Sequence, residues 1–284
     1  MKLIKCEKVL EFSDSINENL IYSLQELIER GILVDHINKK PLIFNDKNEL
    51  VNSAKQKLKL MEGSPITIPY DIQKDYGNMC LNDIIKISDP IIQYQVLSYI
   101  KGSGEVIGVN ADKNLISYKK HLYRMKSFLS NMTGDVLDVG CDDISSSLNV
   151  IPKSCKYLGL DSFVSSSEYF KVFGLAEMLP FANNSFNNLL FNASLDHVLD
   201  YNEAILEAWR VLKNNGYLYI SSYVWKERAT LLKDIIHFHH FRRDQLLCSL
   251  TNYFNIIEVQ NFECPKNNNH RYQIFVKAKK IGKN

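Results

Sequence analysis

Two aspartates stand at the ends of neighbouring predicted strands, where a carboxylate can bind a ligand. Asp138 and Gly140 end one apolar run, and Asp161 ends the next strand, about twenty positions after Gly140. In an open parallel sheet, the carboxyl ends of the strands border the ligand crevice. Glycine lets the backbone turn sharply and approach a ligand, and a carboxylate at Asp161 suits both hydroxyls of a ribose. The pattern predicts a site for a nucleotide-type cofactor.

The second half of the chain alternates predicted strands and helices, which would place these residues in one sheet. Strands are expected over 135–139, 157–160, 188–192 and 217–222, and helices over 145–150, 202–212 and 243–250. Such alternation implies a parallel sheet with right-handed crossovers. Two consecutive strands, over 256–259 and 270–278, end the chain and suggest one antiparallel edge.

The first 114 residues have a less regular pattern. Apolar residues at helical spacing predict a helix over 16–33. Residues 41–44 lead as a short strand into a turn, so a small hairpin is expected. The run 63–78 has the proline, glycine and tyrosine content of an ordered loop that covers a site. A helix over 115–129 closes this region.

The composition is that of a folded protein and argues against several kinds of partner. The chain is 45% hydrophobic and 23% charged, and 34 basic against 32 acidic residues leave a net charge of +2. This balance creates no field that attracts nucleic acid or an anionic membrane. The sequence shows neither an apolar run of about 18 residues, as a membrane span needs, nor a signal peptide. We expect a cytoplasmic protein with six reduced cysteines and no metal site.

Four segments resemble those of class I S-adenosylmethionine-dependent methyltransferases of the small-molecule type, in the order of that family. VLDVGCD resembles the first motif, YLGLD the second, GLAEMLPFANNSFNNLLFNASLDHV the third and fourth, and EAWRVLKNNGYLYIS the following helix and fifth strand. The resemblance implies an α/β fold over residues 115–284: a Rossmann-like, mostly parallel seven-stranded sheet with an antiparallel edge strand. Residues 1–114 would form a mixed α+β cap that helps to choose the substrate.

The resemblance also assigns cofactor contacts to individual positions. It places the methionine end of S-adenosyl-L-methionine beside Asp138 and Gly140 and the ribose beside Asp161. We expect Cys141 to be small filler beside the cofactor and not a nucleophile, because nothing nearby in the sequence would lower the pKa of its thiol. Four further residues are expected to contact the cofactor: Ser162, Ala176, Glu177 and Asn192. The alanine and glutamate would frame the adenine, and the asparagine would lie near the sulfonium.

Two positions differ from the family's pattern. Asp142 stands where the family usually has a second glycine, and its side chain either crowds the cofactor or reaches its ammonium group. Leu175 stands where the family commonly has an acid that accepts the adenine amino group, so backbone groups and apolar packing would hold the adenine. A full phosphate-binding glycine motif is not needed, because the cofactor has no pyrophosphate.

The implied reaction is methyl transfer to a small molecule, with a hydroxyl oxygen of a glycan, phospho-sugar or secondary metabolite favoured over an amine nitrogen. His197 follows the fourth strand and is the candidate base, since histidine titrates near neutral pH; the alternative is a water-exposed histidine at a helix start. Three residues are expected to border the acceptor: Tyr70, His240 and Arg243. Two other functions remain open, a non-catalytic interaction protein built on this fold and an RNA methyltransferase.

Overall fold

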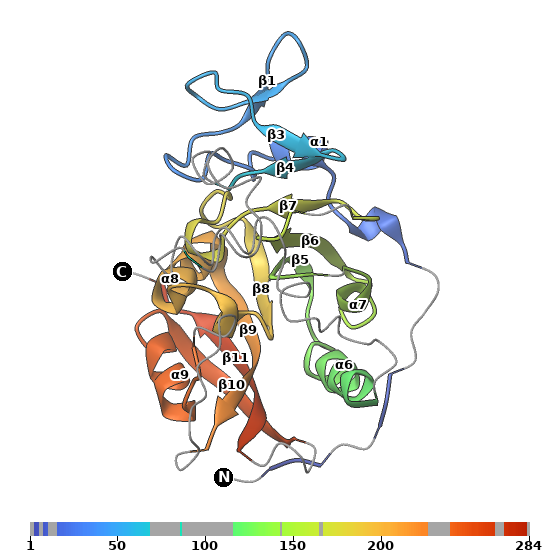
Figure 1. The fold of residues 1–284 in the computed structure, drawn as a ribbon, viewed down its shortest axis with the longest axis vertical. Coiled ribbons are helices and arrows are strands. Elements are labelled where there is room, and N and C mark those ends of the chain that lie inside the picture. Colours follow the sequence, from blue (N-terminus) through green and yellow to red (C-terminus); the bar gives the residue numbers. More distant parts are fainter. Residues whose placement is uncertain are drawn as a thin grey trace.

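A single large sheet forms the centre of the protein (Figure 1). The computed structural model describes residues 3–5, 8–10, 16–68, 86, 116–142, 144–164, 167–226, 239–264 and 270–282. Within them, the sheet has nine strands, in the order β10 (Phe254–Glu263), β11 (Arg271–Lys280), β9 (Leu212–Trp225), β8 (Phe186–Asn192), β5 (Gly134–Val139), β6 (Cys155–Asp161), β7 (Lys171–Phe173), β4 (Ser64–Ile66) and β3 (Lys59–Met61).

The seven strands from β10 to β7 form the predicted mostly parallel sheet. β5 pairs in parallel with β6 and β8, and these pair in parallel with β7 and β9, respectively. β11 lies antiparallel to both β9 and β10, so the predicted antiparallel edge is also confirmed. Apolar residues fill the middle strand because both of its faces are covered, and Val136 and Leu137 are fully buried.

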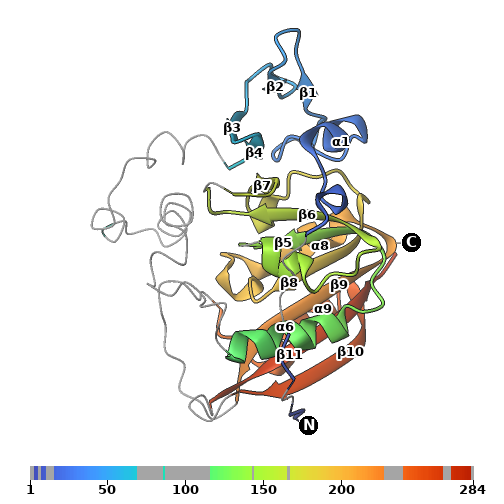
Figure 2. The ribbon, with the colours of Figure 1, turned by 90° about the vertical axis from the view of Figure 1, so that its right-hand side faces the viewer.

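Helices cover both faces of this sheet. Figure 1 shows α6 (Ile116–Phe128) and α7 (Ile144–Leu148) on one side, and α8 (Tyr201–Val211) and α9 (Arg243–Leu250) on the other. Figure 2 shows α6 crossing in front of the strands. Leu122 and Met125 of α6 pack in one buried cluster, while Ala204 of α8 and Leu246 of α9 pack in another. The helix predicted over 115–129 is thus confirmed, and the fold is a three-layer α/β sandwich.

The helix predicted over 16–33 is wrong. The structure has a short turn, η1 (Glu18–Leu20), and then a six-residue helix, α1 (Leu24–Glu29). Between them the backbone N–H of Tyr22 donates to the carbonyl of Tyr157 in β6, at 2.9 Å. The helix starts anew at Ser23, whose side chain accepts the backbone N–H of Glu26 in a capping box. Pairing with a strand more than 130 residues away therefore replaced the predicted continuous helix.

Two short strands pair as the predicted hairpin. β1 (Ile43–Phe44) lies antiparallel to β2 (Leu50–Val51). The side chain of Asn45 stabilises the turn by accepting the backbone N–H groups of Lys47 and Glu49, at 3.0 and 2.9 Å. An asparagine that bonds to the backbone of its own turn is typical of such connections.

The N-terminal part also extends the large sheet, so the sheet has nine strands where seven were expected. β4 lies parallel to β7, and both the backbone N–H and the hydroxyl of Thr67 donate to the carbonyl of Phe173 at 2.8 Å. A Cβ on Gly174 would lie 2.6 Å from the Thr67 hydroxyl oxygen, so glycine permits this close approach. The division at residue 114 stays a prediction. The loop predicted over 63–78 contains β4, and residues 69–78 lie outside the described residues.

Candidate cofactor and acceptor site

Asp138 lies at the end of β5 and is fully buried. Its Oδ2 accepts the hydroxyl of Ser147, from α7, at 2.6 Å and the hydroxyl of Tyr157, from β6, at 2.9 Å. Its Oδ1 is buried and has no hydrogen-bond partner among the described residues. Burial raises the pKa of Asp138 to about 6, and the nearby charge of Asp161 acts in the same direction. An ammonium group would supply the hydrogen-bond donor that this buried oxygen lacks.

Asp161 ends β6 and holds the turn that follows β5. Its Oδ2 accepts the backbone N–H of Asp142 and its Oδ1 accepts that of Phe163, both at 2.8 Å. Each carboxylate oxygen has a second lone pair for a further donor, such as a ribose hydroxyl. Since Asp138 is paired with Gly159 across the two strands, the alternation of strand side chains puts both aspartates on the same face of the sheet, the face of α7.

The turn from Gly140 to Asp142 has left-handed backbone angles at both ends. The φ angle is +78° at Gly140 and +41° at Asp142. A Cβ on Gly140 would lie 2.4 Å from the Cβ of Ser194, so a side chain has no room there. The carbonyl of Asp142 accepts the Nζ of Lys171, which is itself buried, at 3.1 Å. The chain therefore forms the tight turn that glycine usually makes, with an exposed aspartate at its second left-handed position.

These residues fit S-adenosylmethionine. The buried carboxylate oxygen of Asp138 suits its ammonium group, and the free lone pairs of Asp161 suit its ribose hydroxyls. Apolar walls lie close to the same strand ends, because Ile66 and Ile68 from the N-terminal part pack with Val164 and Phe173. This apolar cluster lies next to the end of β6, because Phe173 is paired with Asp161, and apolar packing of the adenine stays a prediction.

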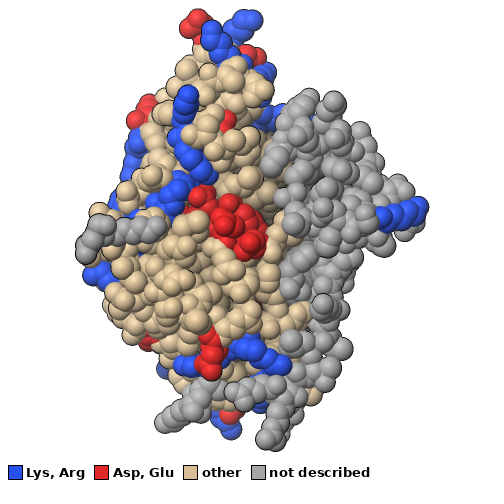
Figure 3. All heavy atoms as spheres, turned by 90° about the vertical axis from the view of Figure 1, so that its left-hand side faces the viewer, with Lys and Arg blue, Asp and Glu red and all other residues tan. Residues whose placement is uncertain are grey.

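Glu177 has a structural contact in addition to its predicted role at the adenine. It lies in the turn η2 (Ala176–Met178), and its Oε1 accepts the backbone N–H of Leu199 at 2.6 Å and of Asp200 at 3.3 Å. Burial raises its pKa. Figure 3 shows acidic side chains gathered near the middle of one face of the molecule. The exposed Asp200 caps the start of α8, and the exposed Glu203 lies in its first turn. Glu177 thus anchors the segment that leads into α8.

A network of partly buried polar side chains holds Asn192 at the end of β8. Its Oδ1 accepts the hydroxyl of Ser221, from β9, at 2.8 Å and the Nε2–H of His121, from α6, at 2.9 Å. The Nδ1 of His121 in turn accepts the side-chain amide of Gln273, from β11, at 2.8 Å. Burial lowers the pKa of His121, which agrees with a neutral ring whose two nitrogens are both bonded.

His121 is not among the site residues predicted from the sequence. The signal was present, because Tyr118, His121, Met125 and Phe128 follow the three- and four-residue spacing of one helix face. A histidine on an otherwise apolar face needs hydrogen-bond partners from another element. Only the fold shows that His121 contacts Asn192.

Two further buried polar atoms lie near the carboxyl ends of β8 and β9, outside this network. The Oδ1 of Asp196 and the Oγ of Ser222 are buried without hydrogen-bond partners among the described residues. Burial is the main cause that raises the pKa of Tyr223, and charges that act on its hydroxyl include Arg124, Arg271 and Asp196. Buried polar groups therefore lie near the carboxyl ends of β8 and β9 on both faces of the sheet.

The other predicted site residues have varied surroundings. Cys141 is buried beside Gly159, and burial raises the pKa of its thiol far above the ordinary value, so it is uncharged filler. His197 is half-buried in the turn η3 (Leu195–His197), directly after β8. The ring of His240 lies 5.4 Å from that of Trp225 at the end of β9. These placements leave the roles of the two histidines as predictions.

The remaining three predicted residues are less informative. Arg243 begins α9 and forms an ion pair with Asp244 at 3.2 Å, while its Nε is buried without a partner among the described residues. Ser162 is half-buried and directly follows Asp161. Tyr70 lies outside the described residues. Within the described part of the chain, no group of three histidine, cysteine or acidic residues is arranged to hold a metal ion, and no helix is long and apolar enough to cross a membrane.

Comparison with known proteins agrees with this geometry. A sequence profile described as a methyltransferase domain matches residues 137–220. Among solved structures, the 1,6-didemethyltoxoflavin-N1-methyltransferase of Burkholderia thailandensis, with 1,6-didemethyltoxoflavin and S-adenosylhomocysteine bound, is 14% identical with a TM-score of 0.51. The match covers 62% of this chain and 85% of that one.

Two further solved structures are similar at lower scores. The PH0226 protein of Pyrococcus horikoshii is 15% identical, with a TM-score of 0.47, over 60% of this chain and 94% of that one. The YcgJ protein of Bacillus subtilis is 16% identical, with a TM-score of 0.46, over 57% of this chain and 99% of that one. The comparison with curated proteins gives no match.

The fold and the strand-end carboxylates define a nucleotide-type cofactor domain of the α/β class. The matched segment identifies it further: the chain contains a class I S-adenosylmethionine-dependent methyltransferase domain, and S-adenosylmethionine is its cofactor. The four sequence segments predicted this family, and the prediction is confirmed.

Proposed function

We propose that the protein methylates a hydroxyl oxygen of a small molecule. The observation that carries the methyl-transfer part of the proposal is the pair of aspartates, Asp138 and Asp161, which share one sheet face at neighbouring strand ends. The choice of a hydroxyl acceptor rests on the position of His197, directly after β8. Around them, the left-handed turn from Gly140 to Asp142 brings backbone close to the same place. This arrangement serves a cofactor with an ammonium group at one end and a ribose further along.

The residues of this chain would act by binding and alignment. The cofactor supplies a methyl group bound to a sulfonium, which makes it electrophilic. Asp138 would hold the ammonium and Asp161 the ribose, while Asn192 at the end of β8 would border the reacting centre. Alignment of acceptor and methyl can supply several kcal/mol of the barrier, with little covalent work for the protein.

A hydroxyl acceptor requires a group that takes its proton. His121 is unsuited, because both of its ring nitrogens are already bonded within the protein. His197 lies one turn beyond Asn192, is half-buried, and remains the proposed base. The acceptor hydroxyl would belong to a glycan, phospho-sugar or secondary metabolite, and the partnerless oxygen of Asp196, next to His197 in η3, would bond to a further hydroxyl.

Two alternatives are less well supported. The net charge of +2 does not favour RNA as an acceptor. A non-catalytic interaction protein does not need a buried, partnerless carboxylate oxygen at the cofactor site, which Asp138 has. The location in the cytoplasm stays a prediction from the sequence.

Calorimetry with S-adenosylhomocysteine tests the cofactor site. We expect binding by the natural chain and a loss of about 1 to 3 kcal/mol in Asp161→Ala, because the ribose loses hydrogen bonds to a carboxylate. Asp161→Asn keeps the side-chain volume and one acceptor oxygen, so it should lose less. Asp46→Ala, an exposed aspartate of the hairpin turn, is the matched control and should bind normally. Absence of binding at millimolar ligand would favour the interaction protein.

Methyl transfer from labelled cofactor to panels of hydroxyl and amine compounds tests the acceptor class. We expect label in hydroxyl compounds, and slower turnover in His197→Ala with unchanged binding of S-adenosylhomocysteine. An unaltered rate in this variant would remove His197 from the mechanism. Label only in amines or in bulk RNA would refute the proposed acceptor.

A further inference from the structure

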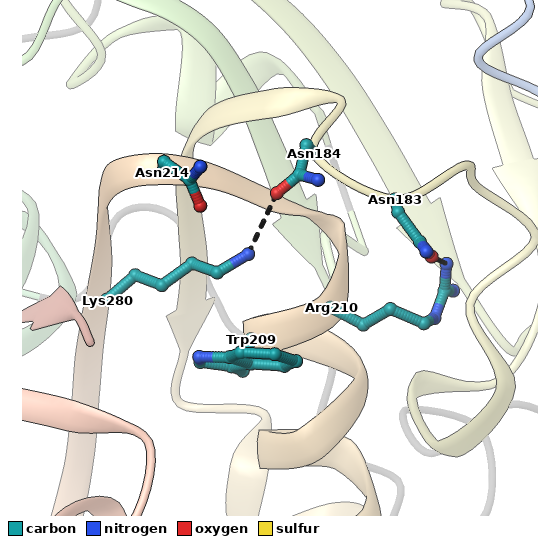
Figure 4. Close-up of a pocket in the computed structure, with 6 residues that line it drawn as sticks. All are labelled: Asn183, Asn184, Trp209, Arg210, Asn214 and Lys280. Carbon is teal, nitrogen blue, oxygen red and sulfur yellow. Dashed lines mark hydrogen bonds between the residues drawn. The ribbon is translucent and has the colours of Figure 1, made fainter. Parts of the chain in front are cut away.

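A pocket lies at the opposite end of the sheet from the cofactor site. It has a volume of about 160 Å³ and is lined by Asn183, Asn184, Trp209, Arg210, Asn214 and Lys280 (Figure 4). The first two of these precede β8, and Asn214 lies near the start of β9. The pocket is therefore at the amino ends of strands whose carboxyl ends carry Asn192 and Ser221.

Lys280 is a buried cation in this pocket. Lys280 is the last residue of β11 and is only 6% exposed. The Nζ donates to the Oδ1 of Asn184 at 3.0 Å and to the carbonyl of Leu212 at 2.5 Å, and it lies 4.5 Å from the ring centroid of Trp209. An ammonium group has three N–H donors, so one remains for a ligand. No carboxylate forms an ion pair with Lys280 within the described ranges.

Arg210 adds positive charge but no free donor. Its guanidinium donates to both carboxylate oxygens of Glu207, to the carbonyls of Leu179 and Phe181, and to the Oδ1 of Asn183. These five bonds use all five of its N–H groups. Glu207 also accepts the Nζ of Lys39 at 3.0 Å, so one carboxylate serves two cations. Burial and the charge of Arg210 both lower the pKa of Lys280. Arg210 is thus paired with Glu207, whereas Lys280 has no carboxylate partner among the described residues.

We propose that this pocket binds a small oxyanion, the phosphate or carboxylate group of a small ligand. The remaining N–H of Lys280 would donate to the anion, and the exposed amides of Asn183, Asn184 and Asn214 provide neutral donors around it. Figure 4 shows the Lys280 side chain extending between Asn214 and the indole of Trp209, which forms the floor. An anion here would compensate a buried charge that the protein leaves unpaired, since burying an isolated cation is costly.

Fluorescence of Trp209 provides a direct assay. The chain has two tryptophans, so Trp225→Phe leaves Trp209 as the single reporter. In this background, inorganic phosphate and acetate are titrated separately against sodium chloride at equal ionic strength. We expect a saturable change with at least one of the two: phosphate alone identifies a phosphate group, and acetate alone a carboxylate. The proposal is overturned if neither phosphate nor acetate changes the fluorescence more than sodium chloride does.

Three variants locate the binding site. Lys280→Gln removes the charge, and the dissociation constant should rise about tenfold or more, as expected for a hydrogen bond to a charged group. Asn214→Asp places a carboxylate beside Lys280 at an exposed position and should weaken anion binding to a similar extent. This variant tests the site even if Lys280→Gln does not fold. Lys277→Gln, on the same strand but over the rings of Tyr217 and Tyr219, is the control and should bind normally. Equal binding by all three variants and the parent would refute the proposed site.

Discussion

Replacing the buried Asp138 with asparagine should change how the stability of the fold depends on pH. In the natural chain, burial raises the pKa of this carboxyl from its ordinary 3.8 to about 6. Because the folded pKa exceeds the unfolded one, protonation favours the folded state. That contribution is fully present below pH 3.8 and is lost as the pH rises through about 6. Asparagine cannot ionise and has no such dependence.

The size of the effect follows from the same pKa values. A difference between 3.8 and about 6 corresponds to about 3 kcal/mol, most of which falls between pH 4 and pH 8. The asparagine Oδ1 can accept the hydroxyls of Ser147 and Tyr157, but its Nδ2 then replaces a carboxylate oxygen that has no partner among the described residues. An unpartnered buried amide costs about 1 to 3 kcal/mol. We therefore expect Asp138→Asn to be less stable at pH 4 and close to the natural chain at pH 8.

Urea unfolding at a series of pH values from 4 to 8, followed by circular dichroism, measures this difference. The free energy of unfolding of Asp138→Asn, relative to the natural chain, should rise by about 2 to 3 kcal/mol across the series. Calorimetry gives an independent readout: an ammonium group bound to Asp138 lowers its pKa, so S-adenosylhomocysteine should release a proton near pH 6 in the natural chain alone.

A constant difference between the two proteins across the pH series would refute the reasoning, since Asp138 would then have an ordinary pKa. Equal proton release by both proteins would separately remove Asp138 from the ammonium site. The two outcomes are distinguishable because unfolding is measured without ligand.

Three further substitutions test local geometry. Asp142→Gly should stabilise the fold by about 1 kcal/mol in thermal unfolding, because aspartate holds a left-handed φ of +41° there; lower stability would contradict this. Gly134→Ala should destabilise the fold by about 1 to 3 kcal/mol, since the new Cβ would lie 2.7 Å from the Oδ1 of Asn187. The loss of stability should be larger than in the control Gly63→Ala, because Gly63 has a similar φ but open space around it. Burial lowers the pKa of His121 below its ordinary 6.5, so the neutral ring stabilises the fold above pH 6.5, and this stability is lost as the pH falls through the folded pKa. In urea unfolding, His121→Gln should therefore lose less stability on acidification than the natural chain. An equally steep loss in both proteins would contradict this prediction.

The strand pattern of the second half could be predicted because it is local. Residues buried on both faces, such as Leu137 and Leu189, make uninterrupted apolar runs whatever their partners are. Once those runs are parallel strands, their carboxyl ends must meet at one edge, so the placement of Asp138 and Asp161 followed from the order of the elements.

The N-terminal part could not be predicted in the same way. The apolar spacing over 16–33 indicated one helix, but Tyr22 pairs with Tyr157 of β6 and divides it. β3 and β4 have three residues each, too few for a periodic signal, and β4 is defined by its pairing with β7. Hydrogen bonds between distant segments decided these elements.

The residue pattern alone therefore established the family, the cofactor and the carboxylates at two strand ends, because each depends on a short segment and its order. The tertiary structure decided which polar groups meet. His121 reaches Asn192 over 71 positions and Gln273 over 152, and Lys280 reaches Asn184 over 96. Periodicity shows which face of an element is buried, but the partner on that face is chosen when the layers pack, and a buried polar group must then find its hydrogen bonds there.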